Sequence, residues 1–208
     1  MFNKTAKDNS HMPWNKGKLM GQKAPLSMQD IWSIRMKLQN EARLRDLALF
    51  NLALDSKLRA CDLLKLRVSD VSNGDTINSR ATVLQQKTGR PVRFEITRKS
   101  RKSLNDWIER AGLTGSDYLF PSRIQMSEHL STRQYSRMVT SWVAAIGLDP
   151  TSYGTHSMRR TKATLLYRRT KNLRAIQLLL GHSKLDSTVR YLGIEIDDAL
   201  EMSEQMDV

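Results

Sequence analysis

The sequence contains a single cysteine, Cys61, and only four histidines. One cysteine cannot form an internal disulfide, and the four dispersed histidines do not have the spacing of a structural zinc site. No apolar run reaches the roughly 18 residues that a membrane-spanning helix needs. The first residues also lack the basic and then apolar order of a signal peptide. We therefore expect a cytoplasmic protein with no membrane-spanning segment and no structural zinc.

Acidic residues are few compared with basic ones. The 208 residues include 34 Lys and Arg but only 21 Asp and Glu, which gives a formal net charge of +13. A field of this size favours a polyanionic partner, with nucleic acid as the first candidate and an anionic membrane as the second. Residues 194–208 hold no Lys or Arg, so the rest of the chain is more basic still.

The chain divides into three parts by composition. Residues 1–25 are rich in lysine and show no sustained periodicity, so we expect a flexible basic N-terminal arm there. Residues 26–193 have the apolar content and the periodicity of one globular domain. Residues 194–208 form an acidic amphipathic C-terminal tail. This tail can fold back on its own domain or dock on a neighbouring protomer.

Most of the globular part has a helical period. Ser27 and Asp30 predict a capping box at the start of the first helix. Gly112, Gly147 and Gly181 are placed as helix ends, while a break at Asp55 and Ser56 is predicted to end the second helix. The predicted helices lie within residues 26–39, 42–54, 58–66, 100–112, 131–147, 157–170 and 172–181.

The period changes to two in the middle of the chain. Residues 81–86 and 91–96 are strand-like, and Lys87, Thr88 and Gly89 supply a turn between them. The pattern predicts an α+β fold that is mainly α, with a small antiparallel hairpin packed on a helical core.

Two pairs of polar residues could form part of a phosphate site. His156 and Arg159 are three positions apart at a helix start, where free backbone N–H groups attract anions. Arg59 and Asp62 have the same spacing. Taken alone, each pair has a plainer explanation, since Arg159 could pair with a nearby carboxylate and Arg59 with Asp62 at the surface.

Three further residues complete the set. Lys87 lies at the hairpin tip or just before it, His182 follows a helix-ending glycine, and Tyr191 comes nine residues later. In this order, the residues resemble the catalytic boxes of the tyrosine recombinase family, also called phage integrases. The resemblance covers roughly residues 27–195 and implies the tyrosine recombinase catalytic-domain fold over residues 26–193.

The resemblance implies that DNA is cut and rejoined through a covalent 3′-phosphotyrosine at Tyr191. The two guanidiniums, on Arg59 and Arg159, suit a phosphate because each offers a planar fork of donors that stays charged. A free phenol is only about 0.1% ionised at pH 7, so Tyr191 needs a base, and His156 is the candidate. By the same resemblance, Lys87 protonates the leaving oxygen and His182 donates a hydrogen bond to the phosphate. Asp62 is implied to orient the segment that carries Arg59.

The resemblance implies no cofactor, because Arg, Lys and His donors supply the charge that a metal would bring. It implies double-stranded DNA as the partner, a nucleoid-associated location and a homo-oligomer on DNA, in particular a tetramer over two sites. Most relatives carry a helical core-binding domain ahead of the catalytic one, and only a short arm stands there in this sequence. A partner protein or an oligomer could close around the DNA instead.

Other basic residues are predicted to position the duplex through its backbone, although each could simply be solvated. Arg133 and Arg137 are weaker candidates for base contacts in a groove. The predicted backbone contacts are Arg160, Lys162, Arg168 and Arg169. Two other functions stay open at this point: a type IB topoisomerase that needs no paired sites, and a DNA-binding accessory protein that has lost catalysis.

Overall fold

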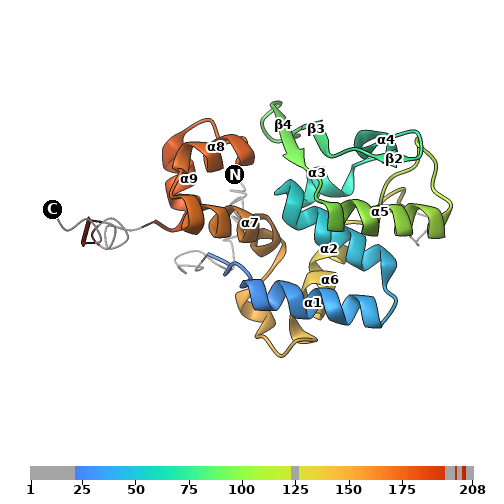
Figure 1. Ribbon diagram of the computed structural model, residues 1–208, viewed down its shortest axis with the longest axis horizontal. Helices are drawn as coiled ribbons and strands as arrows, with labels where there is room; N and C mark the ends of the chain where they lie inside the picture. Colours follow the sequence, from blue (N-terminus) through green and yellow to red (C-terminus); the bar gives the residue numbers. More distant parts are fainter. Residues whose placement is uncertain (1–21, 123–126, 195–199, 201–202, 205–208) are drawn as a thin grey trace, which may run out of the picture.

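Helices make up most of the computed structural model, which describes residues 22–122, 127–194, 200 and 203–204 (Figure 1). The helices are α1 (Met28–Asn40), α2 (Leu44–Ser56), α3 (Ala60–Leu64), α4 (Val68–Val71), α5 (Arg98–Ala111), α6 (Thr132–Ala144), α7 (Thr155–Thr170), α8 (Leu173–Leu180) and α9 (Leu185–Leu192). The strands are β1 (Ser72–Asn73), β2 (Thr76–Ile77), β3 (Arg80–Leu84) and β4 (Pro91–Glu95). Within the described ranges, no helix is long and apolar enough to cross a membrane.

The helix caps follow the sequence closely. Ser27 and Asp30 form the predicted capping box at the start of α1, where the hydroxyl of Ser27 accepts from the Asp30 N–H. Gly112 and Gly181 cap α5 and α8 in the left-handed conformation. Gly147 also has positive φ but lies three residues beyond the end of α6. The predicted hairpin is confirmed, with β3 and β4 antiparallel and Val83 opposite Val92.

Two predictions about the elements need correction. The second helix does not break at Asp55 and Ser56 but runs through both and ends at Lys57, which is left-handed. These polar residues are buried because Asp55 accepts interior hydrogen bonds from Thr97 and Ser100. The second hairpin, β1–β2, was not predicted, since strands of two residues leave no periodic signal.

The core consists of two apolar clusters. The larger one surrounds α2 and includes Phe50 and Trp142, whose rings meet edge to face at 5.6 Å. The smaller one joins α7, α8 and α9 through Ala163, Ile176 and Leu192, and Tyr191 packs against it. In Figure 1, α7, α8 and α9 form one side of the molecule and the β3–β4 hairpin lies beside α8. The predicted site residues lie where these two parts meet.

The predicted N-terminal arm and C-terminal tail fall mostly outside the described residues. Of the arm, residues 22–25 are described, and they pack on the domain: the Ala24 N–H donates to the Ser152 carbonyl, and Gln22 donates to the Arg190 carbonyl. Residues 1–21 and most of the tail lie outside the described ranges, so both remain predictions.

Candidate nucleic-acid cleavage site

Arg159 is directed into the domain rather than toward solvent. It lies on the first turns of α7 and is only 3% exposed. Its Nη2 donates to the Leu180 carbonyl at the end of α8, at 2.8 Å. Its Nη1 is buried and has no hydrogen-bond partner among the described residues. One arm of the guanidinium is thus anchored, and the other is available to an anion.

Arg59 reaches the same carbonyl through Gln85. Arg59 is the N-cap of α3, and its Nη1 donates to Oε1 of Gln85 at 2.8 Å. Nε2 of Gln85 in turn donates to the Leu180 carbonyl at 3.3 Å. Gln85 is 1% exposed and stands at the end of β3. The two arginines, which are far apart in the chain, are therefore joined by one buried amide and one carbonyl.

Tyr191 lies beside the arginines. The Arg159 and Arg160 guanidinium carbons are 5.8 Å and 5.7 Å from the centroid of its ring. The hydroxyl is buried and has no hydrogen-bond partner in the described part of the chain. Burial raises the pKa of Tyr191 to about 12, although the positive charges of Arg159 and Arg160 oppose the shift. The phenol is therefore held neutral at physiological pH.

Both predicted histidines are placed around this cluster. The His182 ring meets Tyr191 edge to face at 5.4 Å, and its Nδ1 lies 3.1 Å from Oγ1 of Thr188. Burial, with Arg159 and Arg59 adding to it, lowers the pKa of His182 to about 4. His156 is exposed at the start of α7, and burial of part of its ring, together with Arg159, lowers its pKa as well. Both imidazoles are neutral at pH 7.

Lys87 is exposed in the turn between β3 and β4 and makes no hydrogen bond or ion pair within the described residues. Two hydrogen bonds hold the turn in place: the Gln86 N–H donates to Asp62 at 3.0 Å, and the Thr88 hydroxyl donates to Gln85 at 3.0 Å. Asp62 is 5% exposed, so the plainer explanation of a surface partner for Arg59 does not hold. The hydrogen bond that Asp62 accepts from the Gln86 N–H supports the hairpin instead.

The close approach of the hairpin to α8 depends on Gly181. This residue has a φ of +67°, and a Cβ added there would lie 2.4 Å from Cγ2 of Val92. Both the backbone and the space therefore require glycine. His182, the next residue, therefore lies close to the β3–β4 hairpin, whose turn contains Lys87.

The charge of the site is unbalanced. No ion pair in the described part of the chain includes Arg59, Arg159 or Arg160, and Nε of Arg160 is also buried without a partner there. Burying unpaired cations is unfavourable unless an anion compensates them. The arrangement therefore suits an anionic ligand, and its forked donors suit a phosphate.

A profile of the Phage integrase family matches residues 25–195. The chain belongs to this family. A probable integrase/recombinase of Bacillus subtilis, YoeC, is 30% identical over 171 residues, which are 82% of this chain and 89% of the relative. A tyrosine recombinase of Pseudothermotoga lettingae is 32% identical over 170 residues, which are 82% of this chain but 55% of that protein. The family that the sequence resembles is confirmed, and with it the tyrosine type of recombinase.

Solved structures show the same fold. The XerA recombinase matches with a TM-score of 0.72 at 23% identity over 90% of this chain and 66% of that one. The XerH site-specific recombinase, in its pre-cleavage complex with difH, matches with a TM-score of 0.68 at 21% identity over 86% of this chain. The phage integrase chain thus has the catalytic-domain fold of tyrosine recombinases, while it spans about half of the XerH protein.

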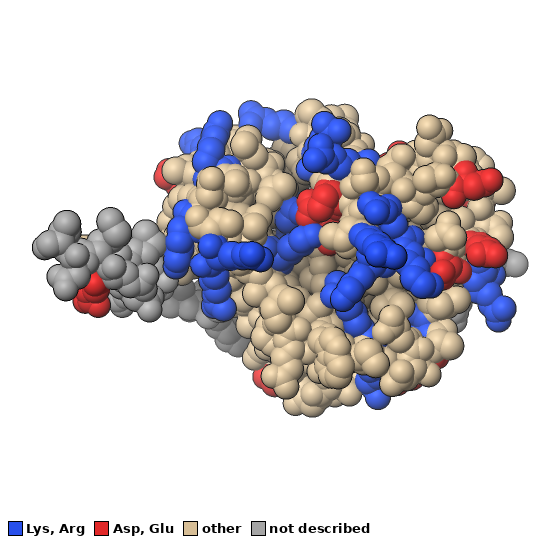
Figure 2. All heavy atoms as spheres, in the orientation of Figure 1, with Lys and Arg blue, Asp and Glu red and all other residues tan. Residues whose placement is uncertain are grey.

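The remaining predicted DNA contacts of this integrase-family chain differ in their surroundings. Arg133 and Arg137 are exposed on α6, and Arg168 and Arg169 are exposed at the end of α7. Figure 2 shows Lys and Arg side chains in both the left and the right half of the face in view. Arg160 and Lys162 already have internal partners: Arg160 donates to the Lys23 carbonyl, and Lys162 pairs with Asp55. Contact of any of these residues with DNA remains a prediction.

Gln85 was missed by the sequence analysis. A glutamine at the end of a strand has no distinguishing local pattern, and its role depends on Leu180, which is 95 residues away. The only available signal was its position two residues before Lys87.

Proposed function

We propose that this chain is the catalytic domain of a site-specific DNA recombinase that cuts and rejoins strands through Tyr191. The observation that carries the proposal is the buried phenol beside guanidiniums that make no ion pair among the described residues. Such a pocket supplies a nucleophile and the charge that stabilises phosphoryl transfer in the same place.

In the proposed reaction, Arg59 and Arg159 bind the nonbridging oxygens of the scissile phosphate, and His182 donates a further hydrogen bond. Oη of Tyr191 attacks the phosphorus and forms the 3′-phosphotyrosyl bond as the bond to the 5′-oxygen breaks. His156 accepts the phenolic proton, and Lys87 gives a proton to the leaving oxygen. Attack by a 5′-hydroxyl reverses these steps, so rejoining consumes no nucleotide.

The proposed partner is double-stranded DNA. The XerH structures are complexes with difH substrate, and a lambda integrase structure is a dimer on a core site. For this chain we propose a homo-oligomer on DNA, in its simplest form a tetramer over two sites. The alternative is an assembly in which a partner protein contributes part of the contact with DNA.

The test is a nicked suicide substrate built from the DNA that flanks the gene. Wild-type protein should form an adduct that resists SDS, and Tyr191→Phe should form none because it lacks the attacking oxygen. Tyr167→Phe is a matched control, since Tyr167 lies on α7 and should leave the adduct intact. An adduct from Tyr191→Phe would exclude Tyr191 as nucleophile.

Two other results would redirect the proposal. Relaxation of supercoiled DNA that lacks any such site would indicate a topoisomerase. Tight DNA binding with no adduct on any candidate site would indicate an accessory protein.

A further inference from the structure

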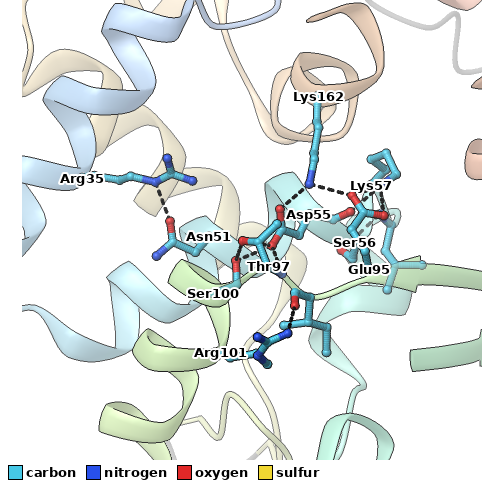
Figure 3. Close-up of polar contacts among 12 residues, drawn as sticks. Arg35, Asn51, Asp55, Ser56, Lys57, Glu95, Thr97, Ser100, Arg101 and Lys162 are labelled. Atoms are coloured by element: carbon cyan, nitrogen blue, oxygen red, sulfur yellow. Dashed lines mark hydrogen bonds and ion pairs between the residues drawn. The ribbon is translucent and has the colours of Figure 1, made fainter. Parts of the chain in front are cut away.

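Four charged side chains, from Asp55, Lys57, Glu95 and Lys162, lie close together in the structure (Figure 3). Nζ of Lys162 lies 2.6 Å from Oδ1 of Asp55 and 2.6 Å from Oε1 of Glu95. Nζ of Lys57 lies 3.0 Å and 3.1 Å from the two carboxylate oxygens of Glu95 and also donates to the Asp55 carbonyl. Two cations and two anions thus satisfy one another, and we call them the lysine–carboxylate cluster.

The cluster joins the three segments that carry Arg59, Arg159 and Lys87. Lys57 precedes Arg59 by two residues. Lys162 follows Arg159 by three residues on α7. Glu95 belongs to β4, which is the second strand of the hairpin. Glu95 is the only member in contact with both lysines through its side chain, so it links all three segments.

The conformation and burial of Lys57 indicate that the lysine–carboxylate cluster has a structural role. The backbone of Lys57 is left-handed, with a φ of 55°, a conformation that non-glycine residues seldom adopt. Its side chain is only 1% exposed, although lysine is rarely buried unless it is paired. The chain turns at this residue from α2 into the N-cap of α3, which is Arg59. The buried ion pair therefore holds a strained turn directly before a site arginine.

The two carboxylates of the cluster are ionised at neutral pH. Burial disfavours the ionised form of Asp55, yet Lys162, Ser100 and Thr97 together hold its pKa below the ordinary value. The pKa of Glu95 is likewise lowered against the effect of burial, by Lys57 and Lys162. Removing one member would leave an unpaired charge inside the fold.

Arg159 and Lys162, both on α7, differ in whether they have an acidic partner. Arg159 has a buried donor with no partner among the described residues, whereas Lys162, one turn later, has two carboxylates. We infer that Glu95, through Lys57 and Lys162, is a positioning residue that sets the separation of Arg59 and Arg159 for one phosphate. This inference rests on the proposed function only in taking both arginines as ligands of the same phosphate.

The test measures phosphate binding directly, with inorganic phosphate as the probe. The Nε–Hε signal of Arg159 is followed by NMR in ¹⁵N-labelled protein, and Arg159→Lys identifies the signal. Glu95→Gln and Lys162→Met should each weaken phosphate binding by about 10- to 100-fold, the range expected when ligands are displaced by up to an ångström. Lys162→Arg should restore most of the affinity, because it keeps the charge.

A second measurement separates positioning from folding and from general charge. The rate of adduct formation on the suicide substrate should fall with the phosphate affinity, while the salt dependence of DNA binding stays that of the wild type. Lys37→Met is the matched control, because it removes one lysine from an exposed ion pair with Glu41. It should change neither phosphate affinity nor adduct rate.

Lys57→Gly keeps the experiment decisive if the other variants unfold. Glycine removes the whole Lys57 side chain but relieves the left-handed turn, which offsets part of the lost packing, so the variant should fold and still bind phosphate more weakly. Unchanged phosphate affinity in folded Glu95→Gln, Lys162→Met or Lys57→Gly would overturn the inference, as would a wild-type Arg159 signal that phosphate does not perturb. If the wild type binds phosphate but forms no adduct, the proposed function fails, and the phosphate titration still decides the inference.

Discussion

The neutral, buried phenol of Tyr191 has a direct chemical consequence. Burial raises the pKa of this proposed nucleophile to about 12, so it is almost entirely protonated in the DNA-free protein. Its hydroxyl is also shielded from solvent. In the proposed reaction, removal of the phenolic proton therefore has to accompany DNA binding, and the proposed base is the exposed imidazole of His156.

His156 should set the acid side of the pH profile for adduct formation. Burial, assisted by the charges of Arg159, Arg160 and Arg59, lowers the pKa of His156 below its ordinary value of 6.5. A base is competent only above its pKa, so the second-order rate constant should rise with pH through an inflection below 6.5. His156→Gln should be slower and lose that inflection.

His129→Gln is the control for this profile, because the His129 ring packs against Tyr118 and not against the site. It should leave the inflection unchanged. If His156→Gln kept the wild-type inflection, the base would have to be another group, and His182, with its pKa of about 4, would be tested next.

At the scale of single elements, the contact between α8 and the hairpin should tolerate only glycine at position 181. Gly181→Ala combines a left-handed backbone with an approach of 2.4 Å to Val92. The backbone alone should cost about 1–2 kcal/mol, and the clash should add to this. Chemical denaturation should show a larger loss than in Gly112→Ala, and adduct formation should slow because His182 is displaced.

Gly112 provides the comparison because it also ends a helix in the left-handed region, with φ of +63°, but has open space around it. Gly112→Ala should therefore show the backbone effect alone and keep full activity. Equal losses of stability in the two variants would mean that the hairpin yields easily at Val92.

The elements also show how far the sequence could predict this fold. Caps such as Ser27 with Asp30, and terminators such as Gly181, are determined by neighbours in the chain, so their positions were predictable. The end of α2 was not, because Asp55 is a polar residue whose partners Thr97 and Ser100 lie more than forty residues away. The order of Arg59, Lys87, His156, Arg159, His182 and Tyr191 indicated the site, whereas the connection through Gln85 exists only in three dimensions.

At the scale of the whole molecule, DNA affinity should depend on the exposed arginines and not on every basic residue. Arg168 and Arg169 are exposed at the end of α7, whereas Lys162 is committed to two carboxylates. The double change Arg168→Gln and Arg169→Gln should flatten the dependence of log affinity on log salt by about two, since each phosphate contact contributes about 0.9.

Lys162→Met should leave that slope unchanged, and fluorescence anisotropy over a series of salt concentrations measures both. An unchanged slope in the arginine variant would place the DNA elsewhere on the surface. A flatter slope in Lys162→Met would mean that its ion pairs open when DNA binds.

The packing of residues 22–24 has a mechanical consequence. Gln22 is hydrogen-bonded to the carbonyl of Arg190, next to Tyr191, and the Lys23 carbonyl accepts from Arg160, whose guanidinium faces the same ring. The beginning of the described chain is thus tied to the helix that bears the tyrosine. Gln22 is the first described residue of this segment, so tension applied to residues 22–24 would reach α9 before the rest of the domain.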